Sequence, residues 1–121
     1  MSKAQFLNDH MKDGEKYAGI CLNEDGSAHH VFLLPWEANG VNWNAATQLA
    51  EKSGGTLPTR QEQSLLFANL KNEFKPNYYW SSEQHAGDSG YAWYQGFGDG
   101  YQGSNRKLGC LRARAVRRLP I

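Results

Sequence analysis

Tyr78-Tyr79-Trp80-Ser81-Ser82-Glu83, followed by Tyr91-Ala92-Trp93-Tyr94-Gln95-Gly96-Phe97, is the stretch that decides the fold. Aromatic residues favour strands, and the segment 86–90 between the two runs is rich in turn-forming residues. The stretch therefore predicts two strands, at 78–83 and 91–97. Successive side chains of a strand point to opposite faces, so about half of these rings should lie in the core and the others on a surface. We expect Trp80 and Trp93 to be structural.

The composition fits one domain of ordinary size. The chain has 121 residues and a formal net charge of +1, which gives no overall reason to expect nucleic acid or a membrane as a partner. Cys21 and Cys110 have no metal-ligand spacing and are predicted to be reduced, buried thiols. Residues 1–10 lack the apolar core of a signal peptide, and no window is apolar enough for a membrane span. We therefore expect a cytoplasmic protein in which residues 1–121 form a single domain.

The N-terminal part predicts a short helix and a hairpin. Ser2-Lys3-Ala4-Gln5 has the form of a capping box, so a helix is expected over 3–11, in an N-terminal extension that spans 1–14. Two strand-like runs, Tyr17 to Leu22 and Ala28 to Leu34, flank the dipeptide Asp25-Gly26, which suits a tight hairpin turn. The second run is apolar on both sides, which predicts a strand that is buried on both faces.

Two longer helices are predicted in the middle of the chain. Asn42 or Asn44 can cap a helix that runs to about Lys52 and is ended by the glycines that follow. Thr59-Arg60-Gln61-Glu62 forms a second capping box, which opens a helix through about Asn72. An apolar stripe at helical spacing makes this second helix the most secure local prediction.

The C-terminal part completes an α+β pattern. Gly98–Asn105 is predicted to be a glycine-rich polar loop, and the last strand is expected over Leu108–Leu119. Apolar and basic residues alternate in this strand until Val116 interrupts the pattern, as a β-bulge would.

Three short motifs, in this order, resemble a known family. They are Leu57-Pro58-Thr59 before a helix, Tyr79-Trp80-Ser81-Ser82 in a strand and Arg114-Ala115-Val116-Arg117 in the closing strand. From about residue 17 to 119 the chain is similar to uncharacterised bacterial and phage domains of C-type-lectin-like fold. The resemblance implies two main helices packed on a twisted, mostly antiparallel sheet, with the N-terminal helix outside it. It also implies that the long loop and the neighbouring strand faces bind ligands, and it favours a phage or prophage origin.

Two activities found on related folds are not expected here. Calcium-dependent lectins carry Glu-Pro-Asn or Gln-Pro-Asp, whereas Lys75-Pro76-Asn77 has a cation where a carboxylate ligand is needed. The formylglycine-generating enzyme needs a cysteine pair whose pattern Cys21 and Cys110 do not match. We therefore expect no metal, no cofactor and no enzymatic activity.

The candidate binding residues lie on the second aromatic strand, in the segment after it and on the last strand. Segment 99–107 mixes the residue types of adaptable binding loops, although an ordinary solvated turn would have the same composition. The full set is Tyr91, Tyr94, Asp99, Tyr101, Gln102, Asn105, Arg106, Arg112 and Arg114.

The arginines of this set allow two interpretations. Arg112 and Arg114 alternate on one face of a strand, and with nearby tyrosines they could hold a nucleotide or another phosphate. Alternatively, the strand is half solvated and its arginines pair with acids of the same protein.

Two further constellations are weak. The neighbours His29-His30 point to opposite faces of a strand, so they cannot easily share a metal ion. A hydrolase would need Ser81 or Ser82 with His85 and Asp88, but no nucleophile elbow or oxyanion signature accompanies them.

The leading hypothesis is a non-enzymatic binding module that contacts a protein, a glycan or a small molecule through segment 99–107 and the aromatic strands. The second hypothesis is an inhibitory or sequestering protein of the host cytoplasm, which holds an anionic ligand or a host partner through its C-terminal arginines. An outward-facing Trp36 or Tyr94 would allow a homo-oligomer.

Overall fold

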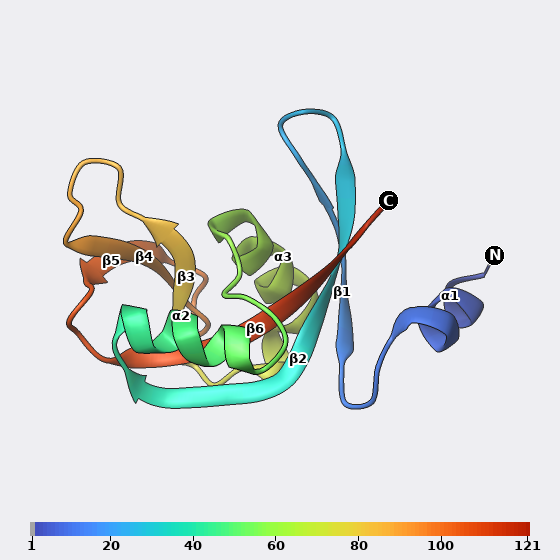
Figure 1. The fold of residues 1–121 in the computed structure, drawn as a ribbon, viewed down its shortest axis with the longest axis horizontal. Coiled ribbons are helices and arrows are strands. Elements are labelled where there is room, and N and C mark those ends of the chain that lie inside the picture. The colour runs from blue at the N-terminus through green and yellow to red at the C-terminus, as the bar shows by residue number, and fades with distance from the viewer. Residues whose placement is uncertain (1) are drawn as a thin grey trace.

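A computed structural model describes residues 2–121 and shows one six-stranded sheet with helices packed on it (Figure 1). The strand order is β1-β2-β6-β3-β4-β5. The strands are β1 (Lys16–Leu22), β2 (Ala28–Val41), β3 (Tyr78–Gln84), β4 (Tyr91–Gly96), β5 (Gln102–Arg106) and β6 (Leu111–Pro120). Neighbouring strands are antiparallel except β3 and β6, which are parallel. The α+β class and the mostly antiparallel sheet are confirmed.

The helices are α1 (Lys3–His10), α2 (Trp43–Lys52) and α3 (Arg60–Leu70), followed by the 3-10 helix η1 (Lys71–Glu73). Ser2 caps α1 through the Gln5 amide, Asn42 rather than Asn44 caps α2, and Thr59 and Glu62 form the complete capping box predicted for α3. The helix expected to reach Asn72 leaves α geometry after Leu70 and tightens into η1. In the described residues, no helix has the length and apolar character needed to cross a membrane.

Strand β2 is longer than predicted. Its expected end was Leu34, but it runs to Val41 and stays beside β6. Residues 31–34 are all buried, which confirms burial on both faces. The register shifts after Leu33, opposite Val116, so the predicted irregularity is present, but the extra residues belong to β2.

The prediction of a loop at Gly98–Asn105 is wrong for its second half. Residues from Gln102 onward form β5, in which Gly103 is opposite Tyr94 and Asn105 is opposite Ala92. Glycine and asparagine disfavour strands locally, so nothing in the segment itself indicated pairing. The neighbouring aromatic strand provides the pairing, which overrides the local preference.

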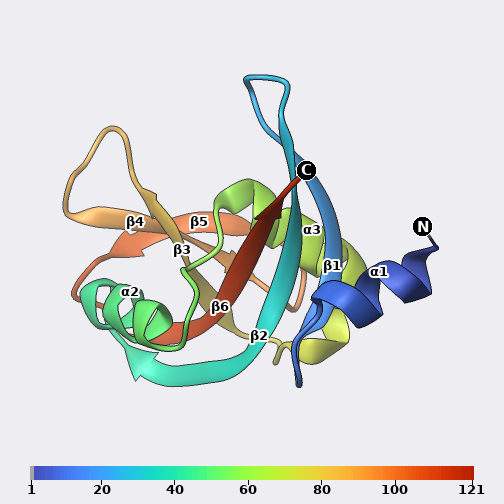
Figure 2. The same cartoon turned by 45° about the vertical axis from the view of Figure 1, so that its right-hand side comes forward.

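Figure 2 shows α2 and α3 on opposite sides of the sheet, and the core is divided between these two faces. On one face, Tyr79 packs in a cluster with Leu66 of α3. On the other face, Trp80 packs in a cluster with Ala46 and Ala50 of α2. The prediction that Trp80 is structural is confirmed, and β3 is held from both sides.

One cysteine differs from its prediction. Cys21 is buried in the cluster beneath α3, as expected, whereas Cys110 is exposed. Cys110 lies at the turn immediately before β6, where the chain is at the surface. Both thiols are free.

Candidate functional site

Arg112 and Arg114, the predicted anion-binding pair, both make contacts within the fold. Arg112 Nη1 donates to Glu37 Oε2 at 2.8 Å. Arg114 donates to the carbonyl oxygens of Leu34, at 3.0 Å, and of Glu73, and its Nη1 lies 3.8 Å from Glu37 Oε1. One carboxylate therefore lies between the two guanidinium groups, and the interpretation of arginines paired with internal acids describes them better than an anion site.

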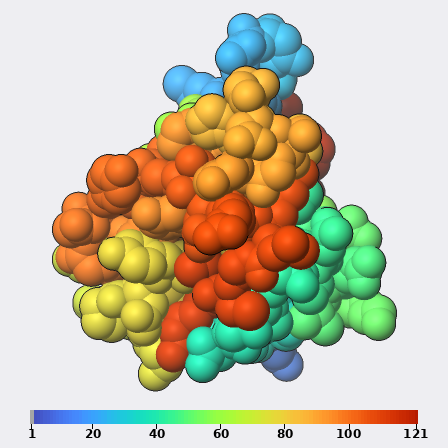
Figure 3. All heavy atoms as spheres, turned by 90° about the vertical axis from the view of Figure 1, so that its left-hand side faces the viewer, coloured from blue at the N-terminus to red at the C-terminus, as the bar shows by residue number. Residues whose placement is uncertain are grey.

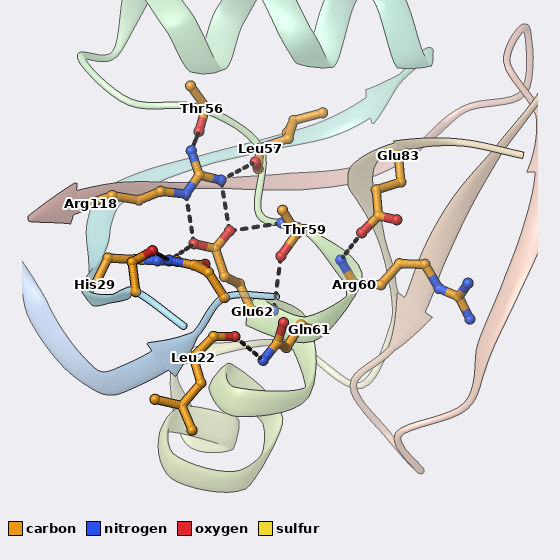
Figure 4. Close-up of polar contacts among 12 residues, drawn as sticks. Leu22, His29, Thr56, Leu57, Thr59, Arg60, Gln61, Glu62, Glu83 and Arg118 are labelled. Carbon is orange, nitrogen blue, oxygen red and sulfur yellow. Dashed lines mark hydrogen bonds and ion pairs between the residues drawn. The ribbon is translucent and has the colours of Figure 1, made fainter. Parts of the chain in front are cut away.

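Glu62 is the centre of a buried polar cluster at the start of α3 (Figure 4). Its Oε2 accepts from Arg118 Nε at 2.6 Å and lies 2.8 Å from His29 Nε2. Its Oε1 accepts from Arg118 Nη2 at 2.7 Å and from the Thr59 amide at 2.9 Å. Burial raises the pKa of Glu62, but the hydrogen bonds from Arg118, Thr59 and His29 and the charge of Arg118 together outweigh burial, so its pKa lies below the ordinary value. The cluster ties α3 to β2 and β6.

Glu15 forms a second buried pair with the same strand. Arg117 donates to Glu15 Oε1 at 2.7 Å and to Glu15 Oε2 at 2.9 Å, which is a two-pronged contact. The hydrogen bond from Arg117 lowers the pKa of Glu15 more than burial raises it. The arginines of β6 therefore hold this strand in place through their contacts with Glu15, Glu37 and Glu62.

Acidification is expected to destabilise the protein through Glu15 and Glu62. Both carboxyls have a lower pKa in the folded state than in the unfolded state. Their stabilising effect is therefore complete above the unfolded value, about 4.3, and is lost as the pH falls through the folded values. Urea denaturation at a series of pH values from neutral to strongly acidic should show this fall. The free energy of unfolding should change less steeply with pH in the Glu15→Gln and Glu62→Gln variants than in the wild type. An unchanged pH dependence in these variants would contradict the role of the two carboxyls.

Tyr78, Tyr94 and Tyr101 form a second feature, at the end of the sheet made by β3, β4 and β5; we call them the tyrosine cluster. The ring centres of Tyr78 and Tyr94 are 5.0 Å apart, and those of Tyr94 and Tyr101 are 6.4 Å apart. Tyr78 is 52% exposed and Tyr101 is 59% exposed, while Tyr94 between them is half buried. The three rings therefore form a continuous aromatic surface that is anchored in its middle.

Glycines allow the rings to lie directly on the backbone of the sheet. A Cβ atom at Gly103 would be 2.8 Å from Tyr94 Oη and 2.9 Å from Tyr101 Cε1. A Cβ atom at Gly96 would be 3.1 Å from Tyr78 Cε1. Any larger residue at Gly103 would have to displace the rings, so this glycine is part of the surface.

Two shallow hollows border the tyrosine cluster and share Tyr78. The first, of about 340 Å³, is lined by Pro76, Asn77, Tyr78, Gly96, Gly98 and Asp99. The second, of about 240 Å³, is lined by Asn39, Asn77, Tyr78, Cys110, Leu111 and Arg112. In Figure 3 the yellow segment before β3 and the orange and red segments of β4 to β6 share this end of the molecule.

The structure divides the predicted binding residues between the two faces of the sheet. Tyr94, Asp99 and Tyr101 come together, because Asp99 Oδ1 accepts from the Tyr101 amide at 3.0 Å and fixes the turn beneath the rings. Arg112 borders the same surface through the second hollow. Asn105, opposite Ala92, shares this face but is not among the contacts of the cluster.

The other predicted residues face α3 instead. Tyr91 and Arg106 are paired across β4 and β5, on the face that carries Trp93. Gln102 Nε2 donates to the Arg60 carbonyl and to Gln95 Oε1, both at 2.8 Å. These three residues are therefore separated from the tyrosine cluster by the sheet.

Sequence reasoning missed Tyr78. It belongs to the same aromatic run as Trp80, and the two residues share a face by strand alternation. Only Trp80 is far enough inside the sheet to be covered by α2, which leaves Tyr78 at the margin. Strand alternation alone could have placed Tyr78 on the same face of the sheet as Tyr94.

The histidine and serine constellations have other partners. His29 contacts Glu62 and His30 contacts Tyr17, so the two histidines do point apart as predicted. The described residues contain no group of three His, Cys, Asp or Glu side chains that could hold a metal ion. His85 Nδ1 accepts from the Gly87 amide, and Asp88 Oδ1 accepts from the Gly90 amide. Ser81 Oγ accepts from the Glu83 amide within β3, so the recorded hydrogen bonds of these side chains join each one to its own segment and not to another member of the triad.

Comparisons with known proteins add no family to this description. No protein-family model matches the chain, and a search of the curated proteins finds no match. The description of the tyrosine cluster therefore rests on its contacts and its exposure.

Proposed function

We propose that the protein is a non-enzymatic binding module of C-type-lectin-like fold, which contacts a protein or glycan partner through the tyrosine cluster. The observation that carries the proposal is the exposure of Tyr78 and Tyr101, each more than half open to solvent although both flank the anchored ring of Tyr94. Exposed aromatic rings that are already ordered lose little conformational entropy on binding. The surface is thus prepared for a partner without needing to rearrange.

The chemistry around the rings supports an uncharged, hydrogen-bonding partner surface. Asn77 and Asp99 line the hollow beside Tyr78 and provide amide and carboxylate groups. Arg112, at the other side of Tyr78, is already paired with Glu37. Aromatic faces bordered by such groups suit the mixed apolar and polar surface of a protein loop or a sugar.

The second hypothesis, an anion held by Arg112 and Arg114, has less support. Both guanidinium groups already donate to partners within the fold, Arg112 to Glu37 and Arg114 to two backbone carbonyls, so a bound anion would have to compete with these contacts. The order of the sequence motifs and the compatible α+β architecture support the lectin-like fold, and the motifs favour a phage or prophage origin.

Tyr78→Ser and Tyr101→Ser should each weaken partner binding at least about tenfold, because central tyrosines commonly contribute more than about 1.4 kcal/mol to an interface. The measurement is a screen of the labelled protein on glycan and peptide arrays, followed by titration of each hit with the wild type and both variants. Both variants should fold normally, since the two rings are exposed.

A matched control is Leu22→Ser, which removes an exposed apolar side chain far from the cluster, on the β1–β2 hairpin. It should leave every genuine hit unchanged. Hits that persist in both tyrosine variants, or that disappear in the Leu22→Ser control, would contradict the proposed site.

A further inference from the structure

A pocket of about 400 Å³ lies between α2 and the segment that connects α2 to α3. Trp43, Thr47 and Glu51 line it from α2, and their spacing of four residues places them in one stripe along the helix. Leu57 of the connection and Arg118 of β6 complete the main walls. The pocket shares no lining residue with the two hollows beside the tyrosine cluster. Its volume is within the range of sites that bind small organic molecules, about 300–1,000 Å³.

The indole of Trp43 gives this pocket a fixed, flat wall. Its Nε1 donates to the Ser81 carbonyl at 2.8 Å, which sets the orientation of the ring. Lys107 Nζ lies 4.6 Å from the ring centre, but Lys107 does not line the pocket, so it covers a part of the indole that the pocket does not use. Leu57 adds a buried apolar side chain. Walls of this kind favour a flat, largely apolar ligand.

The two charged side chains of the pocket come from one end of it. Glu51 is in the last turn of α2, and Thr56 follows it by five residues. Arg118 Nη1 donates to Thr56 Oγ1 at 2.8 Å, as Figure 4 shows. Glu51 and Arg118 are therefore on the same side of the pocket, yet no ion pair between them is recorded among residues 2–121. The space between the two side chains is open to a ligand.

Arg118 offers a hydrogen-bond donor to this space but no free charge. Its Nε and Nη2 donate to Glu62, and Nη2 also lies 3.4 Å from the Leu57 carbonyl oxygen. Because Nη1 uses one N–H for Thr56, its other N–H is left for a ligand. The buried carboxylate of Glu62 neutralises the guanidinium group. A neutral acceptor therefore fits this position better than an anion.

Glu51 offers an acceptor to the same space. It is exposed, and no partner for its side chain is recorded in the described chain. A carboxylate in the last turn of a helix faces the negative end of the helix dipole, so helix stability does not account for it. A ligand N–H group would give this carboxylate a partner.

We propose that the pocket binds a small, uncharged, planar heterocycle with an amide edge, the class to which purine bases such as hypoxanthine belong. The carbonyl oxygen of the edge accepts from Arg118 Nη1, and the adjacent ring N–H donates to Glu51. The rings pack on Leu57 and extend toward Trp43. Trp43 and Glu51 are about 12 Å apart along the helix axis, a gap that their side chains shorten to the length of a two-ring ligand. This site does not depend on the proposed function of the tyrosine cluster.

The test is an NMR titration of the backbone amides with hypoxanthine and with inosine, which carry the amide edge without and with a ribose. Amides of α2 and of residues 56–59 should shift and saturate. The N1-methylated forms of both probes keep the rings and lose only the N–H donor. They should bind at least about tenfold more weakly, since they leave Glu51 without its hydrogen bond.

Two variants should weaken binding of the unmethylated probes at least about tenfold. Glu51→Ala removes the acceptor at an exposed position. Thr47→Phe fills the middle of the pocket, and the hydroxyl that it removes donates only to the Trp43 carbonyl in the preceding turn. The matched control is Gln48→Ala, which truncates an exposed side chain of the same helix that does not line the pocket. It should leave binding unchanged, and circular dichroism should show that every variant is folded.

The absence of saturable shifts in α2 and residues 56–59 would overturn the proposal. Equal binding of the methylated probes would also overturn it, as would binding that persists in Thr47→Phe or is lost in Gln48→Ala. Tyr78→Ser should weaken partner binding at the tyrosine cluster and leave the titration unchanged, so the two proposals fail separately.

Discussion

Replacing Arg118 with alanine is expected to destabilise the protein by about 3–5 kcal/mol, because the change leaves a buried carboxylate without its main partner. Glu62 is 0% exposed, and Arg118 provides two of the hydrogen bonds to its oxygens. The loss should exceed that of Glu62→Ala, since the Arg118 side chain is 34% exposed and can be solvated when its partner is removed. Denaturant unfolding monitored by tryptophan fluorescence measures both values.

The pH dependence of the Arg118→Ala variant is a further check on the cause. Burial is the largest single influence on the pKa of Glu62, and without Arg118 only the hydrogen bonds of Thr59 and His29 oppose it, so the pKa of the carboxyl should be higher in the variant than in the wild type. The variant should then recover stability relative to the wild type as the pH falls, because protonation removes the buried charge. Arg106→Ala is the matched control, since no partner for its exposed side chain is recorded in the described chain, and it should change stability by less than about 0.5 kcal/mol. A deficit in Arg118→Ala that stays constant with pH would contradict an uncompensated Glu62 charge.

Local sequence signals identified the helices and the hairpin because the residues that decide them are close in the chain. The capping box of Thr59 and Glu62 and the positive φ of Gly26 are satisfied within one turn. For the same reason, signals that are local in the sequence could not reveal the second role of Glu62, its ion pair. Its ion pair with Arg118 joins residues that are 56 positions apart, and no periodic pattern indicates such a contact.

The candidate site was predicted in part for the same reason. The composition of segment 99–107 pointed to Tyr101 and Asp99, which the structure does bring beside Tyr94. Composition could not indicate that Gln102 and Arg106 lie on the opposite face, because this depends on a strand that local propensity disfavours. Once β5 is recognised, alternation alone assigns every residue of the segment to a face.

The tyrosine cluster depends on Gly103. A Cβ atom at this position would lie 2.8 Å from Tyr94 Oη and 2.9 Å from Tyr101 Cε1, so a side chain would displace both rings. The residue that weakens the strand by propensity is therefore the one that lets the rings lie on the sheet.

Trp80→Ala is expected to cost about 3–5 kcal/mol, the range for removing a large buried aromatic side chain. Trp80 is 0% exposed and packs with Ala92 and Ala113 beneath α2. Its indole Nε1 donates to the Val41 carbonyl at 2.9 Å, which links β3 to the far end of β2. The substitution therefore opens a cavity and also leaves a carbonyl group without its donor. Denaturant unfolding of the folded variant measures the loss.

The effect of Trp80→Ala should extend to the tyrosine cluster, since Trp80 lies directly opposite Tyr94 in the pair of β3 and β4. Hydrogen exchange of the β4 amides should accelerate more than that of β1, which lies at the other end of the sheet. Tyr101→Ala removes an aromatic ring from the same region, but at an exposed position, and should change stability by less than about 0.5 kcal/mol. Equal losses in the two variants would show that Trp80 is not the anchor of this end of the sheet. A large loss in Trp80→Ala alone, with faster exchange in β4, would show that the exposed rings depend on a buried one for their order.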